Sequence, residues 1–283
     1  MLIHKVCVIL LLNMVFLKGI ASKSTDEKKS EVNFTNPEED EIYFEGDIIL
    51  SSRSLRNGII GDTYRWDKGI IPYQISDNYS TNRKEMILRA FATFHKYTCI
   101  KFIPRKLDHK YYVNIVDEED TCSSHVGRVT YVHNKIILGE TCFKHFGNIL
   151  HELMHTIGFW HEHCRFDRDK FVDIFIENVM AGFEHNFGKR LSIDFNQPYD
   201  YASIMHYSRK MHSKNGKKTI EPKDKSFLAH MGQRKGLSKI DITKINLMYN
   251  CPEKTDAIVN LKRRLYVARK NEYKNYLPDD SEN

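Results

Sequence analysis

Residues 151–161 read His-Glu-Leu-Met-His-Thr-Ile-Gly-Phe-Trp-His. His151 and His155 stand four positions apart, so on a helix both imidazoles project from one face, with room for a metal ion between them. Gly158 predicts the end of that helix, because glycine adopts a left-handed conformation at low cost, and the turn brings His161 round as a third ligand. Three imidazoles leave one position of a zinc ion for water, which is typical of a catalytic site. The stretch therefore predicts a zinc hydrolase, and among the zinc hydrolases it favours a protease.

Two further features support this interpretation. Glu152 follows the first ligand directly, so its carboxylate can reach a metal-bound water without coordinating the metal, and we expect it to act as general base. A bare H-E-x-x-H also occurs in ordinary amphipathic helices; Gly158 and His161 favour zinc over that alternative. Residues 203–207 read Ser-Ile-Met-His-Tyr. Met205 alone would be core filler, but downstream of the extended motif it predicts the methionine turn beneath a metzincin site.

The chain resembles the astacin family of metalloendopeptidases over roughly residues 57–252. The motifs that carry the resemblance are Tyr64-Arg65-Trp66, Gly69-Ile70-Ile71-Pro72-Tyr73, the zinc motif followed by Glu162-His163, Arg165, Asp167-Arg168-Asp169, residues 203–207, Gly232-Gln233-Arg234, Gly236-Leu237-Ser238, Asp241 and Cys251. The resemblance implies an α+β metzincin-like protease domain. A mixed sheet and helices would form its N-terminal half, a largely irregular chain its C-terminal half, and the active-site cleft would lie between them.

The resemblance also assigns roles within the site. It implies one Zn²⁺ per chain, held by His151, His155 and His161. It implies that Tyr207 ligates zinc at rest and swings away to hold the developing oxyanion, although a plain core tyrosine is the alternative. We expect the other histidines, including His163, His185 and His206, to be supporting or surface groups, and Arg234 to shape the cleft.

The N-terminus predicts secretion. Lys5 precedes an apolar run at residues 6–17, and Gly19-Ile20-Ala21 predicts cleavage after Ala21, so residues 1–21 read as a signal peptide. The run is shorter than the ~20 apolar residues of a membrane span. We therefore expect a secreted, extracellular protein without a membrane span.

Residues 22–56 are predicted to form a propeptide. They end in Arg53-Ser54-Leu55-Arg56, which suits a processing protease. By the resemblance, Phe44-Glu45-Gly46-Asp47 matches the propeptide motif whose aspartate displaces the zinc-bound water; by itself Gly46-Asp47 signals only a turn. We expect a zymogen inhibited by Asp47. After cleavage at Arg56, the new ammonium group of Asn57 would fold inward to Glu162, as the family pattern implies.

Five cysteines remain once Cys7 leaves with the signal peptide. Positions matched to the family imply the disulfides Cys99–Cys251 and Cys122–Cys142. Cys164 is left over: we expect a buried free thiol, with intermolecular pairing and redox sensitivity as alternatives.

The overall composition sets wider limits. The chain has 283 residues, 41% hydrophobic content and a net charge of +6, enough for one substantial domain at residues 57–252. The basic residues form no stripe interleaved with aromatics, so we expect no nucleic-acid partner. Asn33 and Asn78 begin N-x-S/T acceptors for glycosylation. Residues 253–283 are predicted to form a solvated tail with a short amphipathic helix; a matrix or membrane-surface contact is the alternative.

Periodicity and turn signals predict the elements. We expect strands at 70–76, 99–103 and 112–116, a hairpin or paired strands within 126–138, and helices at 80–97, 146–157 and 238–248. An extended polypeptide substrate would add to the edge strand between Cys122 and Cys142. Besides polypeptide substrates we expect only the activating protease as a partner, and a monomeric chain. The rival functions are a catalytically silent zinc-binding interaction protein and a structural zinc domain with four protein ligands.

Overall fold

The computed structural model describes residues 42–50, 62–130, 133–190 and 192–251. All of them belong to one compact unit, residues 40–283. The predicted signal peptide, the cleavage site at Arg56, Asn57, Asn33 and the C-terminal tail lie outside the described residues. No described helix is both long enough and apolar enough to cross a bilayer.

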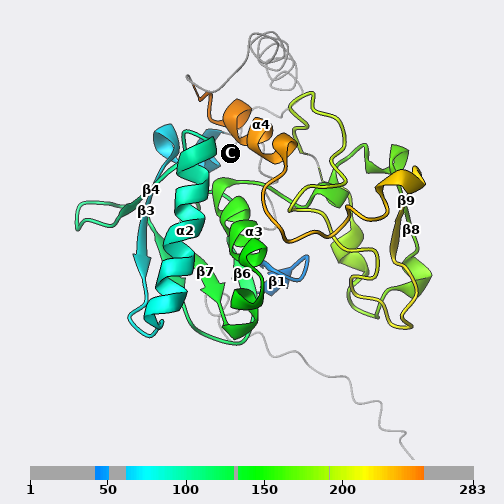
Figure 1. The fold of residues 1–283 in the computed structure, drawn as a ribbon, viewed down its shortest axis with the longest axis horizontal. Coiled ribbons are helices and arrows are strands. Elements are labelled where there is room, and N and C mark those ends of the chain that lie inside the picture. The colour runs from blue at the N-terminus through cyan, green and yellow to red at the C-terminus, as the bar shows by residue number, and fades with distance from the viewer. Residues whose placement is uncertain (1–41, 51–61, 131–132, 191, 252–283) are drawn as a thin grey trace, which may run out of the picture. The chain divides into compact units, whose positions relative to one another are not determined.

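A seven-stranded mixed sheet forms the first half of the described chain (Figure 1). In spatial order its strands are β1 (Ile42–Phe44), β2 (Ile48–Leu50), β6 (Cys122–Ser124), β7 (Asn134–Leu138), β5 (Val113–Val116), β3 (Ile70–Ile75) and β4 (Lys101–Pro104). The strands from β7 to β4 pair in parallel, whereas β6 runs antiparallel to β7. The prediction of strands at 70–76, 99–103 and 112–116 is confirmed to within two residues.

Two helices, α2 (Thr81–Tyr97) and α3 (Phe146–Ile157), pack on this sheet and against each other (Figure 1). The Ser80 hydroxyl caps α2 by accepting a hydrogen bond from the backbone N–H of Arg83. The buried face of α2 repeats at helical spacing, with Ile87, Ala90, Phe91 and Phe94. These side chains and those of α3 share one hydrophobic core with the central strands. The predictions of helices at 80–97 and 146–157 are confirmed.

The prediction of a hairpin or paired strands within residues 126–138 was wrong about the position of the first strand. Among the described residues of this stretch, β7 is the only strand. Its antiparallel partner is β6, with Cys122 opposite Leu138 and Ser124 opposite Ile136. The sequence Cys-Ser-Ser at β6 has no apolar alternation to mark a strand. Its pairing with the buried strand β7 decides its conformation.

The second half of the described chain is mostly irregular, as predicted. It consists of short 3₁₀ turns, a small antiparallel sheet of β8 (Val172–Ile174) and β9 (Ile220–Pro222), and helix α4 (Lys239–Met248). The two-stranded sheet was not predicted. Ser238 caps α4 in a reciprocal capping box with Asp241, as its sequence position suggested. The fold class is α+β.

Both predicted disulfides are confirmed. Cys99 bonds to Cys251 and Cys122 to Cys142. The first ties the end of α4 to the loop between α2 and β4. The second ties strand β6 to the turn that leads into α3. Cys164 is a buried free thiol, as expected.

Strands β1 and β2 form a hairpin whose second strand extends the sheet at β6. Ile48 pairs in parallel with Ser124, and the Ser124 N–H donates to the carbonyl of Asp47. This pairing places the hairpin turn, Glu45 to Asp47, in contact with the histidines of the zinc motif. Glu45 and Gly46 both have positive φ, at 52° and 83°, and Gly46 makes this tight turn inexpensive.

Candidate metal centre

Helix α3 presents His151 and His155 on one buried face. The helix ends at Ile157, and Gly158 follows with φ of 121°, a conformation that favours glycine. The Gly158 N–H donates to the carbonyls of Met154 and His155. This turn redirects the chain so that His161 returns beside the other two imidazoles, with ring centroids 5.2 Å and 4.8 Å from theirs.

Each of the three imidazoles donates a hydrogen bond from Nδ1. His151 donates to the Ile204 carbonyl at 2.8 Å and His155 to the Phe159 carbonyl at 2.8 Å. His161 donates to the Glu45 carboxylate at 2.7 Å. Because Nδ1 of each ring carries the proton and donates it in these hydrogen bonds, each Nε2 keeps its lone pair. The three Nε2 atoms face a common point, which is the arrangement of metal-binding histidines.

Asp47 projects its carboxylate into that point. Its Oδ2 lies 3.0 Å from His151 Nε2 and 3.2 Å from His161 Nε2, and its Oδ1 lies 3.6 Å from His155 Nε2. Burial opposes ionisation of Asp47, but electrostatic attraction to His161 and close contact with the three imidazoles hold its pKa well below the ordinary value.

The donor set fits a divalent cation. The four ligand atoms of these side chains lie within 4.8 Å of one another. Two buried atoms that face the centre, Asp47 Oδ1 and His155 Nε2, have no hydrogen-bond partner among the described residues. The lone pairs of the imidazole Nε2 atoms and the Asp47 carboxylate converge at this centre, and a cation bound there would coordinate all of them. Three imidazoles with a carboxylate oxygen are ligands that zinc accepts.

Glu152 lies beside this centre and is almost fully buried. Its Oε2 also has no hydrogen-bond partner within the described part of the chain. Burial raises the pKa of Glu152 well above its ordinary value, and the Asp47 carboxylate adds to the effect, whereas Arg234 opposes it electrostatically. One Glu152 oxygen thus has no hydrogen-bond partner among the described residues, and the carboxylate takes up a proton more readily than an ordinary glutamate, which suits a group that transfers protons.

Residues 203–207 pass beside the centre, where the Ile204 carbonyl contacts His151. Met205 is buried, and its carbonyl accepts a hydrogen bond from the Glu162 N–H at 3.0 Å. The preceding carbonyl, of Ile204, is the one that orients His151. The segment is held by Asp241, whose carboxylate accepts from the Ser203 hydroxyl at 2.6 Å and the Ile204 N–H at 3.0 Å. The sequence marked Asp241 as a family position but did not reveal this role.

The Tyr207 ring packs against His161, with centroids 4.7 Å apart, and stacks on His163 at 3.9 Å. Its hydroxyl donates to the backbone carbonyl of Glu45. In this structure, then, the hydroxyl is bound to the β1–β2 turn.

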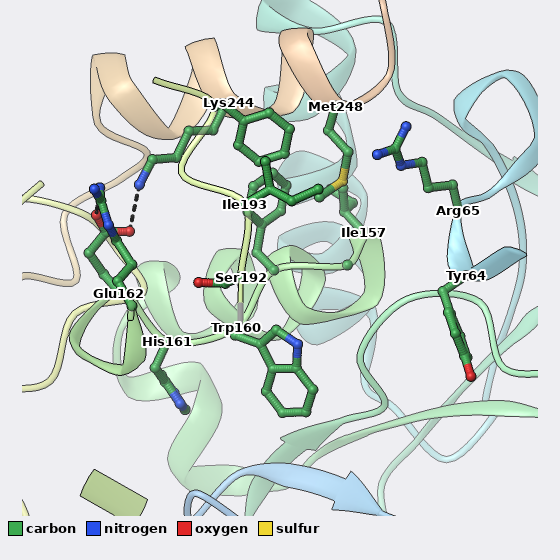
Figure 2. Close-up of a pocket in the computed structure, with 14 residues that line it drawn as sticks. Tyr64, Arg65, Ile157, Trp160, His161, Glu162, Ser192, Ile193, Lys244 and Met248 are labelled. Carbon is green, nitrogen blue, oxygen red and sulfur yellow. Dashed lines mark hydrogen bonds and ion pairs between the residues drawn. The ribbon is translucent and has the colours of Figure 1, made fainter. Parts of the chain in front are cut away.

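Glu162 is a buried carboxylate with three donors. It accepts from Lys244 Nζ at 2.6 Å, Arg165 Nη1 at 3.0 Å and the Asp200 N–H at 3.0 Å. Burial disfavours its charge, but Lys244 and Arg165 keep its pKa below the ordinary value. A pocket opens beside it, and Figure 2 shows Glu162 and Lys244 joined on one side of that pocket. The other labelled lining residues are Tyr64, Arg65, Ile157, Trp160, His161, Ser192, Ile193 and Met248.

His163 and His206 are buried near the centre without joining the ligand group, and His185 is exposed. Arg234 is held by its own loop and by the segment of residues 203–207, since its Nη1 donates to the carbonyls of Gln233 and His206. Asn78 is exposed in the turn before α2.

Sequence reasoning missed Glu45 and Arg190. Glu45 bonds to His161, and Arg190 Nε donates to the other Glu45 oxygen at 2.9 Å. The sequence indicates Glu45 only as part of the propeptide motif, and no motif around Arg190 predicts a role for it in the site.

The model of the astacin peptidase family matches residues 59–250. The chain belongs to the astacin family. This agrees with the resemblance drawn from the motifs and with the geometry of the centre. Among curated proteins, it is 39% identical to zinc metalloproteinase nas-7 of Caenorhabditis elegans over 227 residues, covering 79% of this chain and 58% of that protein. It is 39% identical to the low choriolytic enzyme of Oryzias latipes over 218 residues, covering 75% of this chain and 79% of that enzyme.

A solved structure also resembles this astacin-family chain. High choriolytic enzyme 1, a hatching-enzyme zinc protease of the medaka Oryzias latipes, superposes with a TM-score of 0.63 at 35% identity. The match covers 69% of this chain and all of that one. By contrast, the alignments with nas-7 and nas-13 span only 58% and 55% of those relatives' own lengths.

Proposed function

We propose that the chain is the precursor of a secreted zinc endopeptidase that hydrolyses internal peptide bonds. The observation that carries the proposal is the convergence of three oriented imidazoles beside Glu152, whose buried Oε2 has no hydrogen-bond partner among the described residues. Membership of a peptidase family supports the reaction class. The signal-like N-terminus and the two disulfides support secretion.

The chain's own residues supply the proton transfers. Zinc, when bound, lowers the pKa of water to about 7 and polarises a carbonyl group. Glu152 accepts a proton from the attacking water and passes it to the amide nitrogen as the C–N bond breaks. Tyr207, once released from the Glu45 carbonyl, donates its hydroxyl proton in a hydrogen bond to the oxygen that gains charge.

Latency follows from Asp47. A carboxylate among the three imidazoles takes the place that water needs, so hydrolysis has no nucleophile while β1–β2 stays in place. Removal of residues 22–56 by a processing protease that cuts after Arg56 would free the centre. This leaves a catalytic domain at 57–252 and a tail at 253–283.

Glu162 would then gain a new partner. The pocket beside it in Figure 2 suits the ammonium group that cleavage creates at Asn57. A cation there would join or replace Lys244 and Arg165 on the buried carboxylate. This would order the cleft only in the processed enzyme.

Substrate binding would use the edge that the prosegment covers. Strand β2 extends the sheet at β6, so its departure exposes the backbone groups of β6 for an extended polypeptide. Asn78, exposed in its turn, is available for glycosylation.

Peptide cleavage by processed wild-type protein and its Glu152→Gln variant tests the proposal. Glu152→Gln keeps the shape of the side chain but removes the base, so turnover should fall about 10³-fold or more. Glu177→Gln, at an exposed glutamate, is the matched control and should keep wild-type activity. Equal activity in Glu152→Gln would refute the assigned base.

Chelation separates the rival functions. A phenanthroline-type chelator should abolish cleavage, and added zinc should restore it. Cleavage that is indifferent to the chelator would refute the metal. A processed protein that binds zinc but cleaves no peptide in a library would instead support the catalytically silent binding protein.

A further inference from the structure

The three ligand imidazoles are not oriented by the same kind of group. The carbonyls that orient His151 and His155 belong to Ile204 and Phe159, in the proposed catalytic domain. The group that orients His161 is the carboxylate of Glu45, in the proposed propeptide. Activation would therefore remove a hydrogen-bond partner from one ligand only.

The Glu45 side chain is held in place by two hydrogen bonds from the protein. It is fully buried, and both oxygens are used: Oε2 accepts from His161 Nδ1 at 2.7 Å and Oε1 accepts from Arg190 Nε at 2.9 Å. Arg190 is itself anchored, since its backbone N–H donates to the Cys164 carbonyl at 2.6 Å and its guanidinium lies over the Trp160 ring at 5.6 Å.

The backbone of Glu45 is held as firmly as its side chain. Its carbonyl accepts the hydroxyl of Tyr207, and its φ of 52° places it in the left-handed region. That conformation is sustained by the positive-φ glycine that follows and by these contacts. The turn consequently delivers two carboxylates to the centre, Asp47 to the Nε2 side of the ligands and Glu45 to the Nδ1 side of His161.

A carboxylate on the far nitrogen of a metal-binding imidazole fixes the ring and raises its basicity as a ligand. Loss of such a partner typically lowers metal affinity 10- to 100-fold. We propose that Glu45 is a positioning residue for the latent metal centre, so that the precursor holds its zinc through His161 more tightly than the processed enzyme does. The inference rests on the proposed function, because it takes zinc as the metal.

Zinc release from the uncleaved full chain tests this. A coloured chelator in excess should draw zinc from the Glu45→Gln precursor about 10- to 100-fold faster than from the wild type. Glu177→Gln should release zinc at the wild-type rate. Processing provides a control within the same sample, since cleavage after Arg56 removes residue 45 and makes the two mature proteins identical.

A double-mutant comparison separates orientation of His161 from simple docking of the hairpin. If Glu45 acts on His161, Glu45→Gln must speed zinc release in an Asp47→Ala precursor as well. If Glu45 only holds Asp47 in place, it will have no effect in that background. The imidazole Nδ1–H proton signals of the zinc-loaded precursor give a second readout: Glu45→Gln should shift the His161 signal and leave those of His151 and His155.

Wild-type release rates in Glu45→Gln, or an effect confined to chains with Asp47, would overturn the inference. If Glu45→Gln fails to fold, seen as no activity after processing, Glu45→Asp replaces it. Asp keeps the charge but is one methylene shorter, so the 2.7 Å contact is lost and release should again be faster. A precursor that binds no zinc at all, in any variant, would contradict the proposed function instead.

Discussion

His125 shows how burial controls a histidine outside the metal centre. It is 4% exposed, and its Nδ1 accepts a hydrogen bond from the Lys135 N–H at 3.0 Å. Burial lowers the pKa of His125 to about 4. The unfolded chain, with an ordinary histidine pKa of about 6.5, binds this proton first, so the stability from neutral His125 is present above pH 6.5 and lost as the pH falls toward 4.

The variant His125→Asn should flatten this pH dependence. Asparagine keeps an acceptor near the position of Nδ1 but cannot be protonated. Between pH 7.5 and 5 the wild type should lose about 2 kcal/mol of unfolding free energy through His125, and the variant should not. Urea unfolding at both pH values measures the difference. The exposed His230→Asn serves as control; a variant as acid-sensitive as the wild type would contradict the assignment.

At the scale of elements, the helices and the apolar strands were predictable from the sequence, whereas strand β6 was not. α2 and α3 follow from apolar residues at helical spacing, with Ser80 and Gly158 at their ends. β6 escaped prediction because a strand of Cys-Ser-Ser carries no pattern of its own. A strand of this kind forms because it pairs with neighbouring strands in the sheet, and the local sequence pattern does not show that pairing.

The first turn of α3 also packs closely against the loop of residues 232–236. A Cβ added to Gly147 would lie 2.1 Å from the Arg234 carbonyl oxygen. We expect Gly147→Ala to cost about 1–3 kcal/mol of stability by displacing that loop or the helix. Peptide hydrolysis should fall as well, since α3 carries His151. Melting temperature and kcat/KM measure both effects. At Gly236, whose added Cβ would meet nothing within 4 Å, alanine should leave them unchanged.

The two disulfides should differ in their contribution. They span separations of 152 and 20 residues. On the chain-entropy account, replacing both cysteines of a pair by serine should cost about 5 kcal/mol for Cys99–Cys251 and about 3 kcal/mol for Cys122–Cys142. Urea unfolding without reductant compares them. The reverse order would show that local packing at β6, and not loop length, sets the stabilisation.

On the scale of the whole molecule, the proposed latency would depend on a contact between distant segments. Asp47 and His151 are 104 positions apart in the chain, and the hairpin brings them within 3.0 Å. In uncleaved protein, Asp47→Ala should remove the carboxylate from the centre while β2 still covers β6. Peptide cleavage by the uncleaved variant should exceed that of the uncleaved wild type by about tenfold or more.

The matched control is Asp108→Ala, at an exposed aspartate. It should leave the uncleaved chain as inactive as the wild type. If Asp47→Ala stays fully latent, coverage of the cleft by the hairpin, and not the carboxylate, holds the precursor inactive.

The sequence by itself determined the local geometry of this metal centre. Two histidines four residues apart share a helix face, and a glycine three residues later turns the chain toward the third, because helix periodicity and glycine's φ are local properties. Only the tertiary structure decided which carbonyls and carboxylates orient those rings. Ile204, Glu45 and Arg190 reach the centre through long loops and sheet pairing, whose outcome depends on packing over the whole domain and leaves no periodic trace in the chain.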